Sequence, residues 1–226
     1  DNIALGAITL VEAQALTLDT AETGGGNITV ASLTGVAGGS SENVTLTSGS
    51  GTIAVSGAIG TDIGTLTLQE NDAGATGAVT LSGGVTAATL TTFGRNYDVS
   101  LLEGGTVTNA ATFLNTGTTQ IGDATGDTTT FNGGLTATAG AVTAAGTVAT
   151  SSDNLSLGAV TLASGQNLTL DTGNAGGGDV SVTSIAGVAG GTAENVTLYS
   201  GSGTIDVSSS IFTDIGTLSL HDDNAG

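Results

Sequence analysis

Residues 43–55 read Asn-Val-Thr-Leu-Thr-Ser-Gly-Ser-Gly-Thr-Ile-Ala-Val, and residues 195–207 read Asn-Val-Thr-Leu-Tyr-Ser-Gly-Ser-Gly-Thr-Ile-Asp-Val. Each stretch holds two triplets in which an apolar, a polar and an apolar residue follow one another, and this alternation is typical of a half-buried β-strand. Serine and glycine stand between the triplets and favour a turn. The two stretches therefore predict pairs of short strands, and their near identity predicts a repeat.

The repeat extends far beyond these stretches. Residues 1–74 align without a gap on residues 153–226 at a fixed offset of 152, with 46 identities in 74 positions. We interpret residues 1–152 as a first complete unit and residues 153–226 as the first half of a second copy, continuous with the first. The sequence is therefore expected to be a slice of a longer array that continues into further repeats or associates with itself.

The alternating triplets recur throughout the first copy at spacings that suit stacked coils. Two successive triplets span about 22–26 residues, which is a typical coil of a β-solenoid. We therefore predict an all-β fold, a parallel β-helix or β-solenoid of about ten coils that rise ~4.8 Å each. The triplets are Leu16–Leu18, Ile28–Val30, Val44–Leu46, Ile53–Val55, Leu66–Leu68 and Val79–Leu81.

A sandwich-like array of hairpins is the rival interpretation, because short and evenly spaced strands also build sandwiches. Three features favour the solenoid: the sequence repeats itself, no helical periodicity is present, and only 3% of residues are aromatic. Small aliphatic side chains suit a narrow interior in which coil stacks on coil. Residues 75–152 are predicted to continue the coils with a less regular outline and a loop around Phe93–Tyr97.

Charge excludes several classes of partner. The chain has 20 acidic residues but only one Lys or Arg, Arg95, and its formal net charge is −19. Nucleic acids and anionic membrane surfaces bind through Lys and Arg, so neither is expected as a partner. No apolar run of 18 or more residues occurs, so no membrane span is predicted.

Metal and cofactor candidates are few. Asp123 and Asp127 lie in a glycine-flanked, oxygen-rich turn of the kind that Ca²⁺ favours. Asp222 and Asp223 follow His221, but the first copy has no histidine at the corresponding position. We predict no cofactor, with Ca²⁺ at these four carboxylates as the alternative to ordinary solvated turns.

Catalysis is not expected. A polysaccharide lyase needs a basic residue to abstract a proton and others to hold an acidic sugar, and Arg95 stands alone. A glycosidase needs a paired carboxylate site, and no such cluster recurs. We therefore predict no catalytic residue. The ligand-binding candidates are the aromatic residues Phe93, Tyr97 and Tyr199, which could stack on a sugar.

Four asparagines have the sequence pattern of an N-glycosylation acceptor. We interpret them as turn residues that stack on the next coil. They are Asn43, Asn154, Asn167 and Asn195.

The Gly-, Thr- and Asn-rich strand repeats, such as residues 195–207, resemble those of large repetitive bacterial surface proteins, including filamentous-haemagglutinin-like adhesins and autotransporter passengers. The resemblance implies a right-handed β-helix at the cell surface that serves as a stalk or fibre, and it supplies no functional residue. We expect a structural, non-enzymatic segment of an extracellular fibre or giant adhesin. The alternative is a carbohydrate- or surface-binding module on the same solenoid, with glycans as targets.

Overall fold

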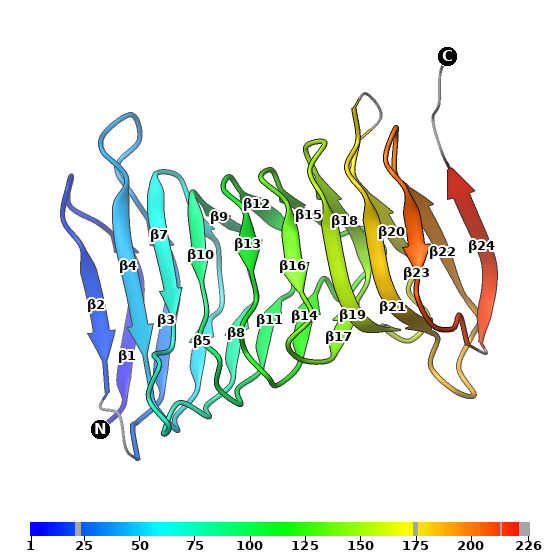
Figure 1. Cartoon of the computed structure of the whole chain (residues 1–226). Coiled ribbons are helices and arrows are strands. Elements are labelled where there is room, and N and C mark those ends of the chain that lie inside the picture. The colour runs from blue at the N-terminus through cyan, green and yellow to red at the C-terminus, as the bar shows by residue number, and fades with distance from the viewer. Residues whose placement is uncertain (21–23, 174–175, 213, 222–226) are drawn as a thin grey trace.

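The computed structural model describes residues 1–20, 24–173, 176–212 and 214–221 as a rod of stacked coils (Figure 1). The described residues contain 24 strands and no helix, and every strand pairing is parallel. The fold is therefore the predicted parallel β-solenoid, with about nine turns instead of ten, and the sandwich alternative is wrong. No helix that could span a membrane occurs in this part of the chain.

Each coil passes over three faces, which we name A, B and C in chain order, and each face is a continuous ladder of parallel strands along the rod. The strands β1, β3, β19 and β21 are long enough to bend from one face onto the next. Face A contains β1 (Ile3–Thr9), β3 (Ile28–Thr34), β5 (Ile53–Val55), β8 (Val79–Leu81), β11 (Val99–Leu101), β14 (Thr119–Ile121), β17 (Val142–Ala144) and the second parts of β19 (Leu155–Leu162) and β21 (Val180–Ala186).

Faces B and C complete each coil. Face B contains the second parts of β1 and β3, then β6 (Ile59–Gly60), β9 (Val85–Ala87), β12 (Gly105–Val107), β15 (Thr128–Phe131), β18 (Gly146–Thr150), β20 (Leu168–Asp171), β22 (Glu194–Tyr199) and β24 (Ile215–His221). Face C contains β2 (Leu16–Asp19), β4 (Glu42–Thr47), β7 (Ile63–Leu68), β10 (Thr89–Thr91), β13 (Ala111–Thr112), β16 (Leu135–Ala137), the first parts of β19 and β21, and β23 (Ile205–Val207).

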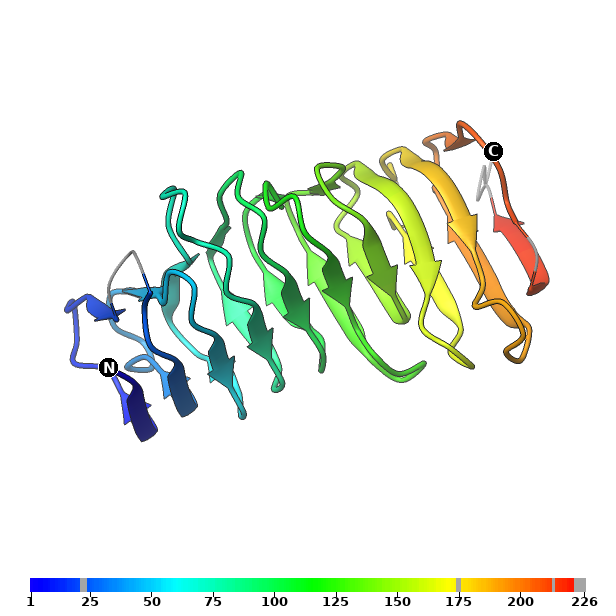
Figure 2. The same cartoon turned by 90° about the horizontal axis from the view of Figure 1, so that it is seen from below.

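Coil length varies while the stacking is kept. The step between paired residues on face A is 26 residues from Ile53 to Val79 but 18 residues from Val142 to Val160. The turns differ in length, whereas each strand triplet stays the same because its two apolar ends must face the interior. The ladders therefore run through residues 75–152 without a break (Figure 2).

The interior is a stack of aliphatic side chains in register. On face A, Ile28, Ile53, Val79 and Val99 follow one another from coil to coil, and all are fully buried. The fully buried aromatic rings are in the middle of the rod, where Phe113 and Phe131 meet edge to face with centroids 6.1 Å apart. Burial of these apolar columns is the main stabilising contribution, at ~25 cal/mol per Å² of apolar surface removed from water.

Asparagine side chains bind one coil to the next. The Oδ1 atoms of Asn43, Asn154, Asn167 and Asn195 each accept a backbone N–H from the following coil, at 2.8–2.9 Å. Asn154 and Asn167 lie outside the strands, as predicted, whereas the prediction of a turn is wrong for Asn43 and Asn195, which lie inside β4 and β22.

Candidate functional site

The first predicted metal position is a self-contained turn. Asp127 Oδ2 accepts the backbone N–H groups of Asp123 and Ala124, both at 2.8 Å, so it stabilises the loop between β14 and β15. In the described part of the chain, no three His, Cys, Asp or Glu side chains gather closely enough to hold a metal ion. Asp222 and Asp223 lie outside the described residues.

The three aromatic candidates lie in different environments. Tyr97 is 1% exposed, its hydroxyl accepts the Phe93 N–H at 2.7 Å, and it donates to the Leu68 carbonyl at 3.2 Å. Burial raises the pKa of the Tyr97 phenol, and the hydrogen bond from Phe93 opposes that shift. Tyr97 as a sugar-stacking residue is therefore wrong, because its ring belongs to the interior.

Phe93 and Tyr199 remain half-buried. The ring of Tyr199 stacks on His221, with centroids 4.3 Å apart and an interplanar angle of 16°. These two rings come from β22 and the end of β24, which are neighbours on face B. Phe93 lies in the loop after β10, many coils away from Tyr199, so the structure does not bring the candidates together into one site.

Two buried carboxylates are the feature that the sequence interpretation missed. Glu42 and Glu194 occupy the same position in the two copies, and each is 1% exposed. Glu42 Oε1 accepts the Ala13 N–H at 3.1 Å, and its Oε2 accepts the Val36 N–H at 3.2 Å. Glu194 Oε1 accepts the Gly165 N–H at 2.8 Å.

Each of these glutamates ties three successive coils together. The backbone N–H of Glu42 donates to the Asp62 carbonyl of the next coil at 2.9 Å, while its side chain reaches back to Ala13 of the preceding coil. A Cβ atom on Gly35 would lie 2.5 Å from Glu42 Oε2, so only glycine leaves room for the carboxylate. A side chain this buried cannot reach an external substrate, and the geometry supports a structural role.

Lysine and arginine do not neutralise these carboxylates. The one such residue, Arg95, donates through Nε and Nη2 to the Asn71 carbonyl, at 3.0 and 2.5 Å. Glu194 Oε2 has no hydrogen-bond partner among the residues that the structure describes. Backbone N–H groups therefore compensate both carboxylate oxygens of Glu42 but only Oε1 of Glu194.

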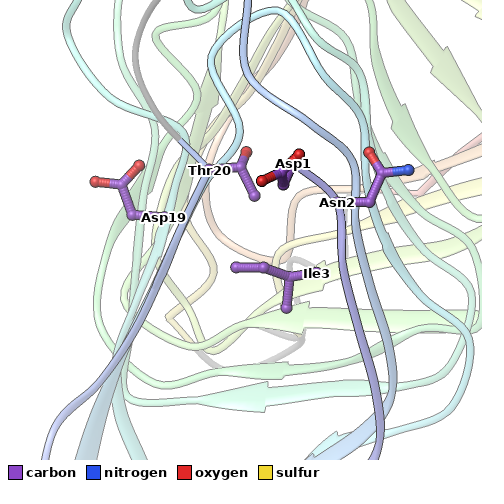
Figure 3. A pocket seen from close by; sticks show the side chains of 5 residues that line it. All are labelled: Asp1, Asn2, Ile3, Asp19 and Thr20. Carbon is purple, nitrogen blue, oxygen red and sulfur yellow. The ribbon is translucent and has the colours of Figure 1, made fainter.

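A hollow of about 450 Å³ opens at the N-terminal end of the rod (Figure 3). Asp1, Asn2, Ile3, Asp19 and Thr20 line it, and Ile3 points into the space in the close-up view. The hollow lies beside β1 and β2.

Comparison with known proteins adds no relative: no family model, no curated protein and no solved structure matches the chain.

Proposed function

We propose that the chain is a structural, non-enzymatic segment of an extracellular bacterial surface fibre or giant adhesin, in which it serves as a rigid stalk. The observation that carries the proposal is the continuity of the three strand ladders along the rod. A rod whose turns are all joined in the same way transmits force along its axis and can be lengthened by further turns.

The geometry of the ladders favours a load-bearing role. Neighbouring coils are joined by backbone hydrogen bonds on three faces, by asparagine side chains, and by the buried glutamates Glu42 and Glu194. Each hydrogen bond contributes only ~1 kcal/mol net, but axial tension loads all the bonds between two coils together. Separating two coils therefore requires many bonds to break at once.

Surface charge and sequence composition suit an exposed location. The net charge of −19 makes rods repel one another and stay soluble. Trypsin-like proteases have a single cleavage position, after Arg95, and its side chain is fastened to the Asn71 carbonyl. The proposed stalk needs no cofactor.

The location is tested by immunogold electron microscopy of the source cells with antibodies raised against the chain. Gold particles along surface fibres are the expected result, and gold confined to the cell interior overturns the proposal. Small-angle scattering of the purified chain provides the second measurement. It should report a rod of about nine coils, or ~43 Å, at ~4.8 Å per coil.

The alternative function, carbohydrate binding, depends on the half-buried rings of Phe93 and Tyr199. A glycan array measured with the full chain and with Tyr199→Ala separates the two functions. Binding that is lost in Tyr199→Ala favours the binding module, whereas no glycan binding by either protein favours the stalk. Tyr97→Phe is the matched control, because Tyr97 is buried and its hydroxyl does not reach the surface.

A further inference from the structure

The 74-residue module that occurs twice, residues 1–74 and 153–226, forms corresponding strands in the described residues of both copies, except that β6 corresponds to an isolated bridge at Ile211. β3, β4 and β5 reappear as β21, β22 and β23, with bounds displaced by the repeat offset of 152. Side-chain contacts reappear as well: Asn43 Oδ1 accepts the Thr65 N–H at 2.8 Å, and Asn195 Oδ1 accepts the Thr217 N–H at 2.9 Å. The local structure therefore follows the sequence of the module.

The two copies nevertheless lie on different faces of the rod. β1 begins on face A and continues onto face B, whereas its counterpart β19 begins on face C and continues onto face A. β2 lies on face C, and its counterpart β20 lies on face B. Each strand of the second copy thus lies one face earlier than its counterpart: face A becomes C, face B becomes A, and face C becomes B.

The intervening segment, residues 75–152, causes this rotation. The module fills nine face positions, which is three full coils, because β1 and β3 each cover two faces. The segment 75–152 contributes eleven strands, β8 to β18, each on one face. Eleven is not a multiple of three, so one unit of 152 residues completes six and two-thirds coils instead of a whole number.

The second copy also shows what covers the first coil of the module. β19 and β20 rest on β16, β17 and β18, whereas the equivalent edge formed by β1 and β2 is open. Leu157 is consequently 2% exposed, but its counterpart Leu5 is 42% exposed.

We infer that a further copy of the unit joined before Asp1 rests its β16–β18 segment on β1 and β2, as this chain rests it on β19 and β20, and that each added unit turns by one face of the three. In the docked state Leu135 of the added copy pairs with Ile3, as Leu135 pairs with Leu155 within this chain. Val142 of the added copy likewise pairs with Ile8. This register is independent of the proposed role at the cell surface.

The opposite end of the rod fits the same occupant. β23 and β24 correspond to β5 and β7, which carry β8 and β10 in the first copy. Leu220 is 58% exposed on this edge, while its counterpart Leu68 is fully buried beneath the next coil. A segment with the sequence of residues 75–152 therefore fits one end of the rod with its first strands and the other end with its last.

Disulfide cross-linking tests the rotation in the full chain, which contains no cysteine of its own. Thr136 and Ser156 are opposite each other on β16 and β19. Thr136→Cys with Ser156→Cys should form an intramolecular disulfide on mild oxidation. The control pair, Thr143→Cys with Ser156→Cys, would be adjacent only if the unit held a whole number of coils. A disulfide in the control pair alone overturns the rotation.

Docking is tested by adding a second copy of residues 75–152 directly before Asp1. Thr136→Cys in the added segment should cross-link to Ala4→Cys, because Ala4 is the counterpart of Ser156. Thr143→Cys in the added segment should not cross-link to Ala4→Cys. Failure of the first pair overturns the inference, whether the added segment docks elsewhere or does not fold, and the pair within the full chain serves as the positive control.

Discussion

Truncating the same leucine in the two copies should have two different costs. Leu157 is 2% exposed beneath β16 and β17, and its counterpart Leu5 is 42% exposed at the open end. Replacing a fully buried leucine with alanine removes about 3 kcal/mol, which combines the lost transfer free energy and the cavity that remains. At position 5 roughly half of the side chain is already in water and no closed cavity forms, so we expect about 1 kcal/mol.

Urea unfolding followed by circular dichroism measures this difference. With a denaturant slope of ~3 kcal/mol per molar for a chain of this size, Leu157→Ala should lower the unfolding midpoint by ~1 M and Leu5→Ala by ~0.3 M. Thr161→Ala, a substitution of an exposed residue on β19, is the control and should leave the midpoint unchanged. Equal shifts for Leu5→Ala and Leu157→Ala would refute the claim that coverage by β16–β18 distinguishes the two copies.

Three other perturbations test the interior. Phe131→Ala should lower the free energy of unfolding by about 3–5 kcal/mol, because the ring is fully buried, and a loss below 1 kcal/mol in urea unfolding would contradict the packing. Burial raises the pKa of Tyr97, so this residue stabilises the fold at pH values below the ordinary tyrosine pKa near 10, and the contribution is lost as the pH rises through the raised pKa. In Tyr199→Phe, where Tyr97 is the remaining tyrosine, phenolate absorbance should therefore appear only at a pH above the ordinary pKa. Ionisation of the folded protein at the ordinary pKa would refute this. Glu42→Ala leaves two backbone N–H groups without an acceptor and should cost about 2 kcal/mol in thermal unfolding, whereas the exposed Glu103→Ala should cost almost nothing.

The alternation in the sequence was sufficient to predict the strands and their parallel stacking. Val44–Leu46 and Ile53–Val55 alternate as an interior ladder requires, and the gap-free repeat favours one continuous rod. The rotation could not be predicted, because β1 and β3 bend across two faces inside a single strand, with one glycine, Gly6, in β1 and none in β3. A count of triplets therefore does not give the number of faces in a unit.

The candidate site was predicted less well than the fold, for physical reasons. Glutamate is usually exposed, and nothing near Glu42 in the sequence reveals that Ala13 donates to it from the preceding coil. Tyr97 was predicted as a sugar-stacking residue in a loop, yet it is buried and its hydroxyl donates to the Leu68 carbonyl. Both outcomes depend on contacts between coils, and these contacts join residues that are distant in the sequence.

Because each unit ends two-thirds of the way round a coil, the number of copies sets the direction about the rod axis that the end of the array faces. Adding one unit to such an array lengthens it by ~32 Å at ~4.8 Å per coil and swings everything distal to it by a third of a revolution about the axis. Three added units restore the original bearing after twenty coils, ~96 Å further out. Two arrays that differ by a single duplicated unit would therefore differ in length and also in the orientation of their ends about the rod axis.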